Sequence, residues 1–231
     1  MLLESATAVF KKMSHAAMRA GRKPEDVRLV AVTKTVGIDG IRKATDIGLR
    51  VFGENKVQEA KEKISNLQLE ILDMKVEWHL IGPLQRNKAK YAVRLFDLIH
   101  SLASEGLAED LNKEAGKTGK VQRVLIQVKL SEEETKHGVS EQELPLLVEK
   151  MTRFGNLKLE GLMTMPPFFD DPELARPFFR RLRELRDGLE KNGFILPELS
   201  MGMSNDYEVA IQEGATLVRI GTAIFGERRV A

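Results

Sequence analysis

Short apolar runs alternate with longer amphipathic stretches along most of this 231-residue chain. The runs are rich in Val, Ile and Leu, and the stretches between them carry apolar residues at helical spacing over about 10 to 20 residues. This alternation is typical of strand–helix–strand units whose strands are parallel. We expect eight strands, at Arg28–Lys34, Val51–Asn55, Glu77–Gly82, Leu95–Leu102, Val121–Leu130, Leu157–Met165, Glu198–Ser204 and Thr216–Thr222.

A further helix precedes the first predicted strand. Its pattern runs from about Leu2 to Ala20, and Gly21 follows it as an end signal. Glycines also mark the ends of later helical stretches, since glycine adopts the left-handed conformation in which many helices end. We expect Gly48, Gly116 and Gly214 to have this role.

Eight strands and their intervening helices fit either a closed barrel or an open, doubly wound sheet. An open sheet that binds a dinucleotide normally carries a glycine-rich turn after its first strand. The turn here, Thr33-Lys34-Thr35-Val36-Gly37, has no GxGxxG pattern. The last two strands end in small and hydroxyl residues, where barrels bind phosphate groups. The sequence therefore predicts the α/β class, with residues 1–231 forming a single (β/α)8 TIM barrel with an extra N-terminal helix.

Composition excludes several classes of function. The 36 basic and 34 acidic residues give a net charge of +2, so there is no electrostatic case for nucleic acid. The absence of cysteine excludes disulfides and thiolate catalysis, and the four histidines lack metal-ligand spacing, so we expect no metal. No apolar run approaches the roughly 20 residues that cross a bilayer. With no signal-peptide pattern either, we expect a cytoplasmic protein that contacts no membrane.

Polar residues at the ends of parallel strands meet at one mouth of a barrel, so these ends hold the candidate chemistry. Lys34 ends the first strand. Taken alone it reads as a solvated lysine, but desolvation and a neighbouring cation at the mouth would lower the pKa of its amine. A deprotonated amine can attack an aldehyde. Beside a phosphate site, Lys34 suggests a phosphate-bearing aldehyde held as a Schiff base.

The ends of the last two strands supply the candidate phosphate site. Ser204 can cap the helix that follows it, and the same junction can bind an anion through free N–H groups. Gly221 permits close approach to an anion, and Thr222 adds a hydroxyl. Arg219 faces the same side as Gly221. It fits either an ion pair inside the barrel or a donor aimed at a ligand ring or carboxylate.

Three other strand-end features read as structural. Gly53-Glu54-Asn55 has the composition of a turn. His79 and His100 are expected to be satisfied core residues rather than bases, and Trp78 is expected to pack in the core.

Seven segments together resemble the YggS/PROSC group of pyridoxal 5′-phosphate (PLP) homeostasis proteins, which are similar to the N-terminal barrel domain of alanine racemase. These segments are Ala31–Lys34, Phe52–Glu59, Trp78–Lys88, His100–Leu102, Gly161–Met163, Leu199–Ser204 and Val218–Gly226. The resemblance implies a barrel with PLP bound to Lys34 as a Schiff base. It also implies phosphate contacts from Ser204, Gly221 and Thr222.

The resemblance further implies the surroundings of the PLP ring. Arg219 is expected to face the pyridine nitrogen, with Asn55 and Met203 near the ring. An arginine there keeps the nitrogen unprotonated, which makes the ring a poorer electron sink. Racemisation would also need a second base on the opposite face, which a tyrosine from a second domain supplies in alanine racemase. This chain ends at Ala231, and its tyrosines, Tyr91 and Tyr207, fall in helical stretches.

We therefore expect a protein that buffers or delivers PLP without robust turnover, with apo PLP-dependent enzymes as recipients. The lack of a second domain suggests a monomer or a weak dimer. Three alternatives remain open. The first is a PLP-dependent amino-acid racemase that uses Lys34 as one base. The second is a Schiff-base aldolase or sugar-phosphate isomerase without PLP, against which the lack of strand-end acids argues. The third is a signalling or scaffold module that senses PLP.

Overall fold

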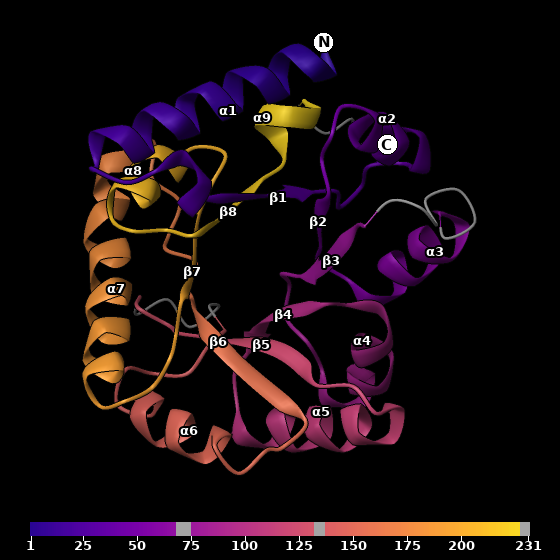
Figure 1. The fold of residues 1–231 in the computed structure, drawn as a ribbon, viewed down its shortest axis with the longest axis vertical. Helices are drawn as coiled ribbons and strands as arrows, with labels where there is room; N and C mark the ends of the chain where they lie inside the picture. Colours follow the sequence, from indigo (N-terminus) through magenta and orange to yellow (C-terminus); the bar gives the residue numbers. More distant parts are fainter. Residues whose placement is uncertain (68–74, 132–136, 227–231) are drawn as a thin grey trace.

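The computed structural model describes residues 1–67, 75–131 and 137–226, and in it eight parallel strands close into a barrel (Figure 1). Neighbours in sequence are neighbours in the barrel, and β8 pairs with β1. The strands are β1 Arg28–Val32, β2 Val51–Glu54, β3 Glu77–Leu80, β4 Leu98–Leu102, β5 Gln122–Gln127, β6 Leu157–Met163, β7 Glu198–Met203 and β8 Leu217–Ile220. The predicted TIM barrel is confirmed, and each strand lies within its predicted range.

Helices surround the barrel, as Figure 1 shows. They are α1 Leu2–Arg19, α2 Ile38–Asp46, α3 Val57–Leu67, α4 Ala89–Leu95, α5 Glu105–Thr118, α6 Leu144–Met151, α7 Arg176–Lys191, α8 Tyr207–Gln212 and α9 Thr222–Phe225. Short 3-10 turns lie at Pro24–Asp26, Arg86–Lys88 and Pro172–Ala175. The predicted N-terminal helix is confirmed as α1. Within the described ranges, no helix is both long enough and apolar enough to cross a membrane.

Two apolar clusters form the core. The larger lies between strands and helices, and it includes Trp78, whose ring packs 5.4 Å from that of Phe52 between centroids. The expected packing role of Trp78 is thereby confirmed. The smaller cluster gathers alternate residues of the strands, among them Val30, Leu125 and Leu217, which fill the barrel interior. Both faces of each strand are therefore buried, which explains the near-continuous apolar runs.

Three element boundaries differ from the prediction. The fourth strand begins at Leu98 because Leu95 is the last residue of α4, and apolar periodicity does not separate a helix end from a strand start. The fifth strand ends at Gln127, beyond which Val128 forms only an isolated bridge. Gly116 does not end its helix. Instead α5 continues to Gly119, which has φ of 66°.

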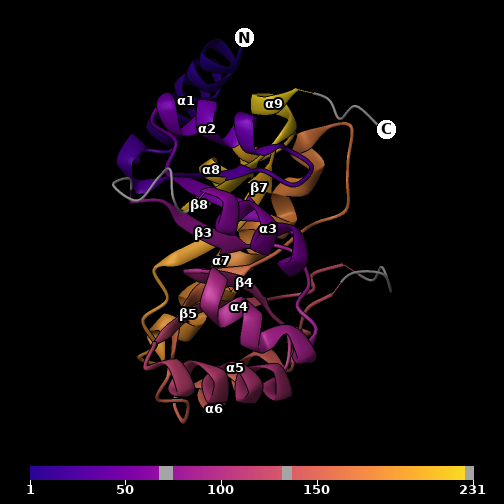
Figure 2. The same ribbon diagram turned by 90° about the vertical axis from the view of Figure 1, so that its right-hand side faces the viewer.

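The barrel closure brings together the loops that contain the candidate residues. Because β1 pairs with both β2 and β8, the loop after β1 lies between the loops after these two strands. The short helix α9 follows β8, and α1 packs against both α8 and α9. Figures 1 and 2 show α1, α2 and α9 gathered at one end of the molecule.

Candidate functional site

An open cleft of about 700 Å³ lies where β1 and β8 end. Three of the predicted site residues line it together: Lys34 from the loop after β1, and Gly221 and Thr222 from the end of β8. The first residues of α1, Gly40 and Lys43 of α2, and most of α9 complete the wall. The structure thus brings an amine and a glycine-containing strand end to one space, as the sequence predicts.

Lys34 lies in a tight turn. The N–H group of Val36 donates to the carbonyl oxygen of Thr33 at 2.9 Å, which closes the turn around the half-buried lysine. Thr35, the residue after Lys34, has φ of 66° and is the one non-glycine residue with positive φ among those described. Such a conformation is a genuine outlier for a β-branched residue. The expected lowering of the Lys34 pKa stays a prediction.

Ser204 joins the ends of β7 and β8. Its Oγ accepts the N–H group of Gly221 at 3.2 Å and that of Ala223 at 3.4 Å. Ser204 therefore caps α9, across the barrel rim. The sequence alone predicts that it caps the helix that follows it in the chain. That helix, α8, begins later, and Asp206 occupies its N-cap position. Ser204 Oγ thus uses its acceptor positions on these two N–H groups, and its O–H group is a donor at the same rim.

Gly221 stands where β8 approaches β1 closely. A Cβ at this position would lie 3.3 Å from both the backbone oxygen and the Cβ of Val32, which is tighter than ordinary contact. Glycine at this position therefore lets the end of β8 lie close to β1, the strand that precedes Lys34. The close approach predicted for Gly221 is thus made to protein backbone in this structure.

Asn55 and Met203 lie at the rim of the barrel but do not line the 700 Å³ cleft. Asn55 follows β2, and its backbone lies close to Gly82. A Cβ on Gly82 would overlap the carbonyl oxygen of Asn55. Met203 is half-buried at the end of β7, where it pairs in register with Arg219. Their expected places near a PLP ring stay predictions.

Arg219 is buried inside the barrel, with 3% of its surface exposed. Its guanidinium donates to Ser200 Oγ at 2.5 Å and to the carbonyl oxygen of Thr164 at 2.9 Å. Burial lowers its pKa to about 10, and the negative charge of Asp206 opposes that shift. Arg219 is therefore still a cation at neutral pH. Of its five N–H groups, these two bonds use two, so others remain to donate toward a ligand.

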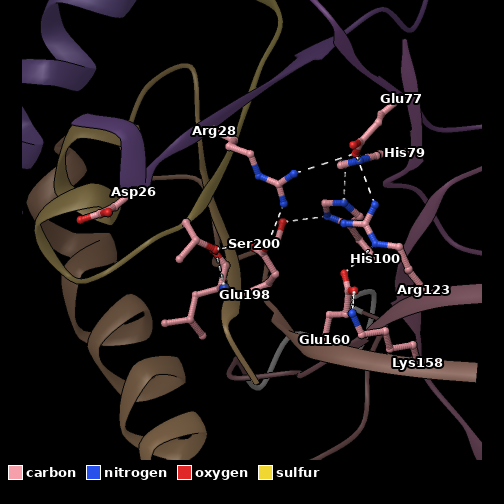
Figure 3. A network of polar contacts seen from close by, with 12 residues as sticks. Asp26, Arg28, Glu77, His79, His100, Arg123, Lys158, Glu160, Glu198 and Ser200 are labelled. Atoms are coloured by element: carbon pink, nitrogen blue, oxygen red, sulfur yellow. Dashed lines mark hydrogen bonds and ion pairs between the residues drawn. The ribbon is translucent and has the colours of Figure 1, made fainter. Parts of the chain in front are cut away.

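From Ser200, which accepts from Arg219, a hydrogen-bonded chain continues through the two histidines to Glu77 (Figure 3). Ser200 Oγ lies 2.8 Å from His100 Nδ1, His100 Nε2 lies 3.1 Å from His79 Nδ1, and His79 Nε2 lies 3.2 Å from Glu77 Oε2. An arginine can only donate and an ionised carboxylate can only accept. The donation therefore runs in one direction, from Arg219 to Glu77, and each histidine carries its proton on Nε2.

The protonation states agree with this direction. Burial lowers the pKa of His79 and lowers that of His100 well below its ordinary value. Glu77 accepts from His79, which is the main reason its pKa falls to about 2. The prediction that both histidines are satisfied core residues is confirmed. What the sequence did not reveal is that they connect to Arg219 through Ser200.

A layer of ion pairs fills the opposite end of the barrel. Arg28 Nη2 lies 2.6 Å from Glu198 Oε1. Arg123 contacts two carboxylates, with its Nε 2.8 Å from Glu160 Oε2 and its Nη1 3.4 Å from Glu77 Oε2. Figure 3 shows these side chains around the two histidines. The polar interior thus runs from this charged layer up to Arg219, below the rim that carries Lys34.

Glu54 is a functional candidate that sequence reasoning missed, because Gly53-Glu54-Asn55 read as a turn. Glu54 is the last residue of β2, within the predicted strand, and it is fully buried. Its carboxylate binds Lys63 at 2.8 Å and the hydroxyl of Thr33 at 2.6 Å. The available signal was the spacing of Glu59 and Lys63, which places opposite charges on one helix face.

Neither tyrosine lines the cleft. Tyr207 is buried in α8, and burial raises its pKa to about 12. Tyr91 lies at the surface on α4, under the amine of Lys61 at 5.7 Å from the ring centroid. Across the described ranges, no group of three or more His, Asp or Glu side chains has a geometry that could hold a metal ion.

Comparison with known proteins gives consistent results. The family model described as "Alanine racemase, N-terminal domain" matches residues 8–229. A pyridoxal phosphate homeostasis protein of Aquifex aeolicus is 48% identical over 227 residues, covering 98% of both chains. One from Escherichia coli K12 is 41% identical over 219 residues, covering 94% of this chain and 92% of the relative.

A solved structure agrees with these sequence matches. PipY of Synechococcus elongatus PCC7942, determined with PLP bound, superposes with a TM-score of 0.84 at 35% identity. The alignment covers 98% of this chain and 100% of PipY.

Proposed function

This chain belongs to the alanine racemase N-terminal domain family and, within it, to the pyridoxal phosphate homeostasis proteins, and we propose that it binds PLP reversibly at the Lys34 cleft. The observation that carries the proposal is the meeting of an amine with a polar strand end in one cleft. Lys34, Gly221 and Thr222 line that cleft, and Ser204 is hydrogen-bonded to its β8 side.

The residues present fit the chemistry of PLP. PLP supplies an aldehyde that bonds reversibly to an amine, together with a phosphate that needs several donors. Lys34 would provide the amine. The hydroxyls of Ser204 and Thr222 would donate to the phosphate, as donors at a strand end do in barrels. The phosphate would replace Ser204 Oγ as the acceptor of the N–H groups of Gly221 and Ala223.

Arg219 would serve the pyridine nitrogen, with Asn55 and Met203 beside the ring. Because a guanidinium only donates, a ring nitrogen that faces it accepts and carries no proton. The directional chain below Arg219 supports this role, since Ser200 and the carbonyl of Thr164 hold two of its N–H groups and orient the rest. Such a ring is a poor electron sink, which disfavours carbanion chemistry.

We infer that the protein holds and releases PLP rather than turning over a substrate. Racemisation needs a second base across from the lysine. The residues that line the cleft include neither a tyrosine nor a histidine, and both tyrosines of the chain lie elsewhere. This observation disfavours the racemase alternative. PLP-dependent apoenzymes as recipients, a monomeric or weakly dimeric state and a cytoplasmic location remain predictions.

A spectral titration tests the site. PLP added to the wild-type protein should give a visible absorbance band shifted from that of free PLP, and Lys34→Ala should abolish this shifted band. Lys43→Ala is the matched control, because Lys43 lines the same cleft and its loss should leave the band in place. A band that survives in Lys34→Ala, or that Lys43→Ala removes, would show that the amine is wrongly assigned.

A second assay tests the lack of turnover. PLP-loaded protein is incubated with L-alanine in deuterated water, and exchange of the α-proton is followed by NMR. We expect exchange no faster than with free PLP. Rapid exchange that depends on Lys34 would support the racemase alternative instead.

A further inference from the structure

An ionic cluster with two buried members and one half-buried member contacts the backbone on both sides of Lys34. We call Glu54, Glu59 and Lys63 the Lys63 cluster. Two of its members come from α3 and one from the end of β2. The cluster contacts the residue before Lys34 and the residue after it.

Lys63 is the centre of this cluster, and its side chain is only 10% exposed. Its ammonium lies 2.6 Å from the carbonyl oxygen of Thr33, 2.8 Å from Glu54 Oε1 and 2.6 Å from Glu59 Oε1. An ammonium has three N–H donors. All three are used, so the position of Lys63 is fully determined by these contacts.

The two carboxylates complete the grip on the turn. Glu54 Oε1 also accepts the hydroxyl of Thr33 at 2.6 Å. Glu59 Oε1 also accepts the backbone N–H of Thr35 at 2.7 Å. Thr33 is thus held by its hydroxyl and its carbonyl, and Thr35 by its N–H, with Lys34 between them.

The backbone conformation of Thr35 explains why these hydrogen bonds to the turn are needed. Its φ of 66° is unfavourable for a β-branched residue. A strained conformation persists only where its surroundings over-determine it, and such sites cluster where a ligand is bound. The Glu59 bond to the Thr35 N–H is one such determinant.

Stability alone is a weak explanation for the cluster. Removing charges from water is costly, and a buried ion pair is often no more stabilising than an apolar replacement of similar volume. Glu54 Oε2 is buried with no hydrogen-bond partner in the described part of the chain, which adds to this cost. A cluster that is costly to bury but touches both neighbours of Lys34 fits a positioning role better.

We propose that Lys63, together with Glu54 and Glu59, positions Lys34 by fixing the Thr33–Thr35 turn in the strained shape that presents its amine to an aldehyde. The inference rests on the proposed function, because it assigns the cluster to that same amine. Lys63 does not touch the ligand. It acts through the backbone on either side of Lys34.

Lys63→Met tests the inference, since methionine keeps much of the side-chain volume and removes the three donors. Lys120→Met is the matched control. Lys120 is half-buried, less deeply than Lys63, and it likewise donates to backbone carbonyls, those of Val93 at 2.8 Å and Phe96 at 2.6 Å. Glu59→Ala is a milder second variant, because Glu59 is partly exposed and Lys63 keeps Glu54 as its partner.

Three properties are measured on variants that circular dichroism shows to be folded. These are the Kd for PLP from the absorbance band, the Kd for pyridoxine 5′-phosphate, and hydrogen exchange of the peptide spanning residues 33–37 without ligand. We expect Lys63→Met to weaken PLP binding at least about tenfold, as misplacement of a reacting group does. Pyridoxine 5′-phosphate, which has no aldehyde, should bind within about twofold of wild type, and exchange in the turn should accelerate.

The outcomes separate this inference from the proposed function. If Lys63→Met fails to fold, Glu59→Ala is expected to give the same changes with smaller size. Unchanged PLP affinity and exchange in the folded variants would overturn the positioning role while leaving PLP binding intact. Equal losses in Lys120→Met would show a general stability effect and also overturn it. No PLP binding by the wild type would overturn the proposed function and this inference together.

Discussion

Ser204 holds the N–H groups of Gly221 and Ala223 at the end of β8, at 3.2 and 3.4 Å. Ser204→Ala removes this acceptor and a hydroxyl that can donate to phosphate. We predict that the variant binds PLP about tenfold more weakly, since a hydrogen bond to a charged group contributes about 1.5–3 kcal/mol.

Pyridoxal is the control ligand for Ser204→Ala, because it has the aldehyde but no phosphate. Its affinity, measured by the same absorbance titration, should change little. A similar loss for both ligands would mean that Ser204 acts on the whole rim rather than on the phosphate.

For single residues, the sequence predicts correctly the positions that depend only on where a strand ends. Lys34, Gly221 and Thr222 meet in one cleft because each lies within two residues of the end of a strand of a closed barrel. The partners of Arg219 could not be predicted in this way. Ser200 and the carbonyl of Thr164 come from other parts of the chain, and only the register of the closed barrel brings them to the guanidinium.

At the element scale, Gly119 has φ of 66° and ends α5. Gly119→Ala should lower the free energy of unfolding by about 1 kcal/mol, because a Cβ is unfavourable in the left-handed region. Gly188, an exposed residue inside α7 with open space around it, is the opposite case. Gly188→Ala should raise the free energy by about 0.5–1 kcal/mol, since alanine favours helix.

Urea denaturation of the two variants beside wild type checks both signs. The same sign for both substitutions would show that backbone conformation does not decide the cost at these glycines.

The two glycines near the end of α5 show how closely the sequence pattern can predict where a helix ends. The sequence predicts a helix ending in glycine but does not distinguish Gly116 from Gly119. The choice depends on tertiary contact, because a Cβ at Gly116 would lie 3.0 Å from the side chain of Asn156. Gly116 therefore gives room for a neighbouring loop, and the last turn of α5 extends past it.

At the scale of the whole molecule, two neutral histidines buried in the barrel make stability depend on pH. The folded-state pKa values of His79 and His100 are lowered by burial, while the unfolded chain has the ordinary value of 6.5. The unfolded state therefore takes up protons first. Their contribution is present above about pH 6.5 and is lost as the pH falls below it.

Urea unfolding at pH 8, 6 and 5 measures this dependence. We predict a fall in the free energy of unfolding from pH 8 to pH 5, and a shallower fall in His100→Gln. Glu77 acts in a lower window, because its pKa of about 2 lies below its ordinary value and its contribution is lost only below about pH 4.5. Equal slopes in wild type and His100→Gln would contradict the assignment.

The whole barrel was predictable from the sequence because strand–helix alternation repeats eight times and parallel strands are apolar on both faces. Its polar interior was not. Arg28, Glu77 and Arg123 each look like solvated residues beside a strand, yet the closed barrel gathers them into one layer beneath the histidines. That residues 1–231 form a single domain stays a prediction, as does the oligomeric state.

The most direct test of reversible PLP binding on Lys34 is to reduce the PLP-loaded protein with borohydride and map the modified peptides by mass spectrometry. The expected result is one pyridoxyl group per chain, located on Lys34. Without reduction, an added amine should release the PLP. Modification spread over many lysines, or a single adduct elsewhere, would show that Lys34 does not hold PLP and would favour the alternative of a sugar-phosphate enzyme.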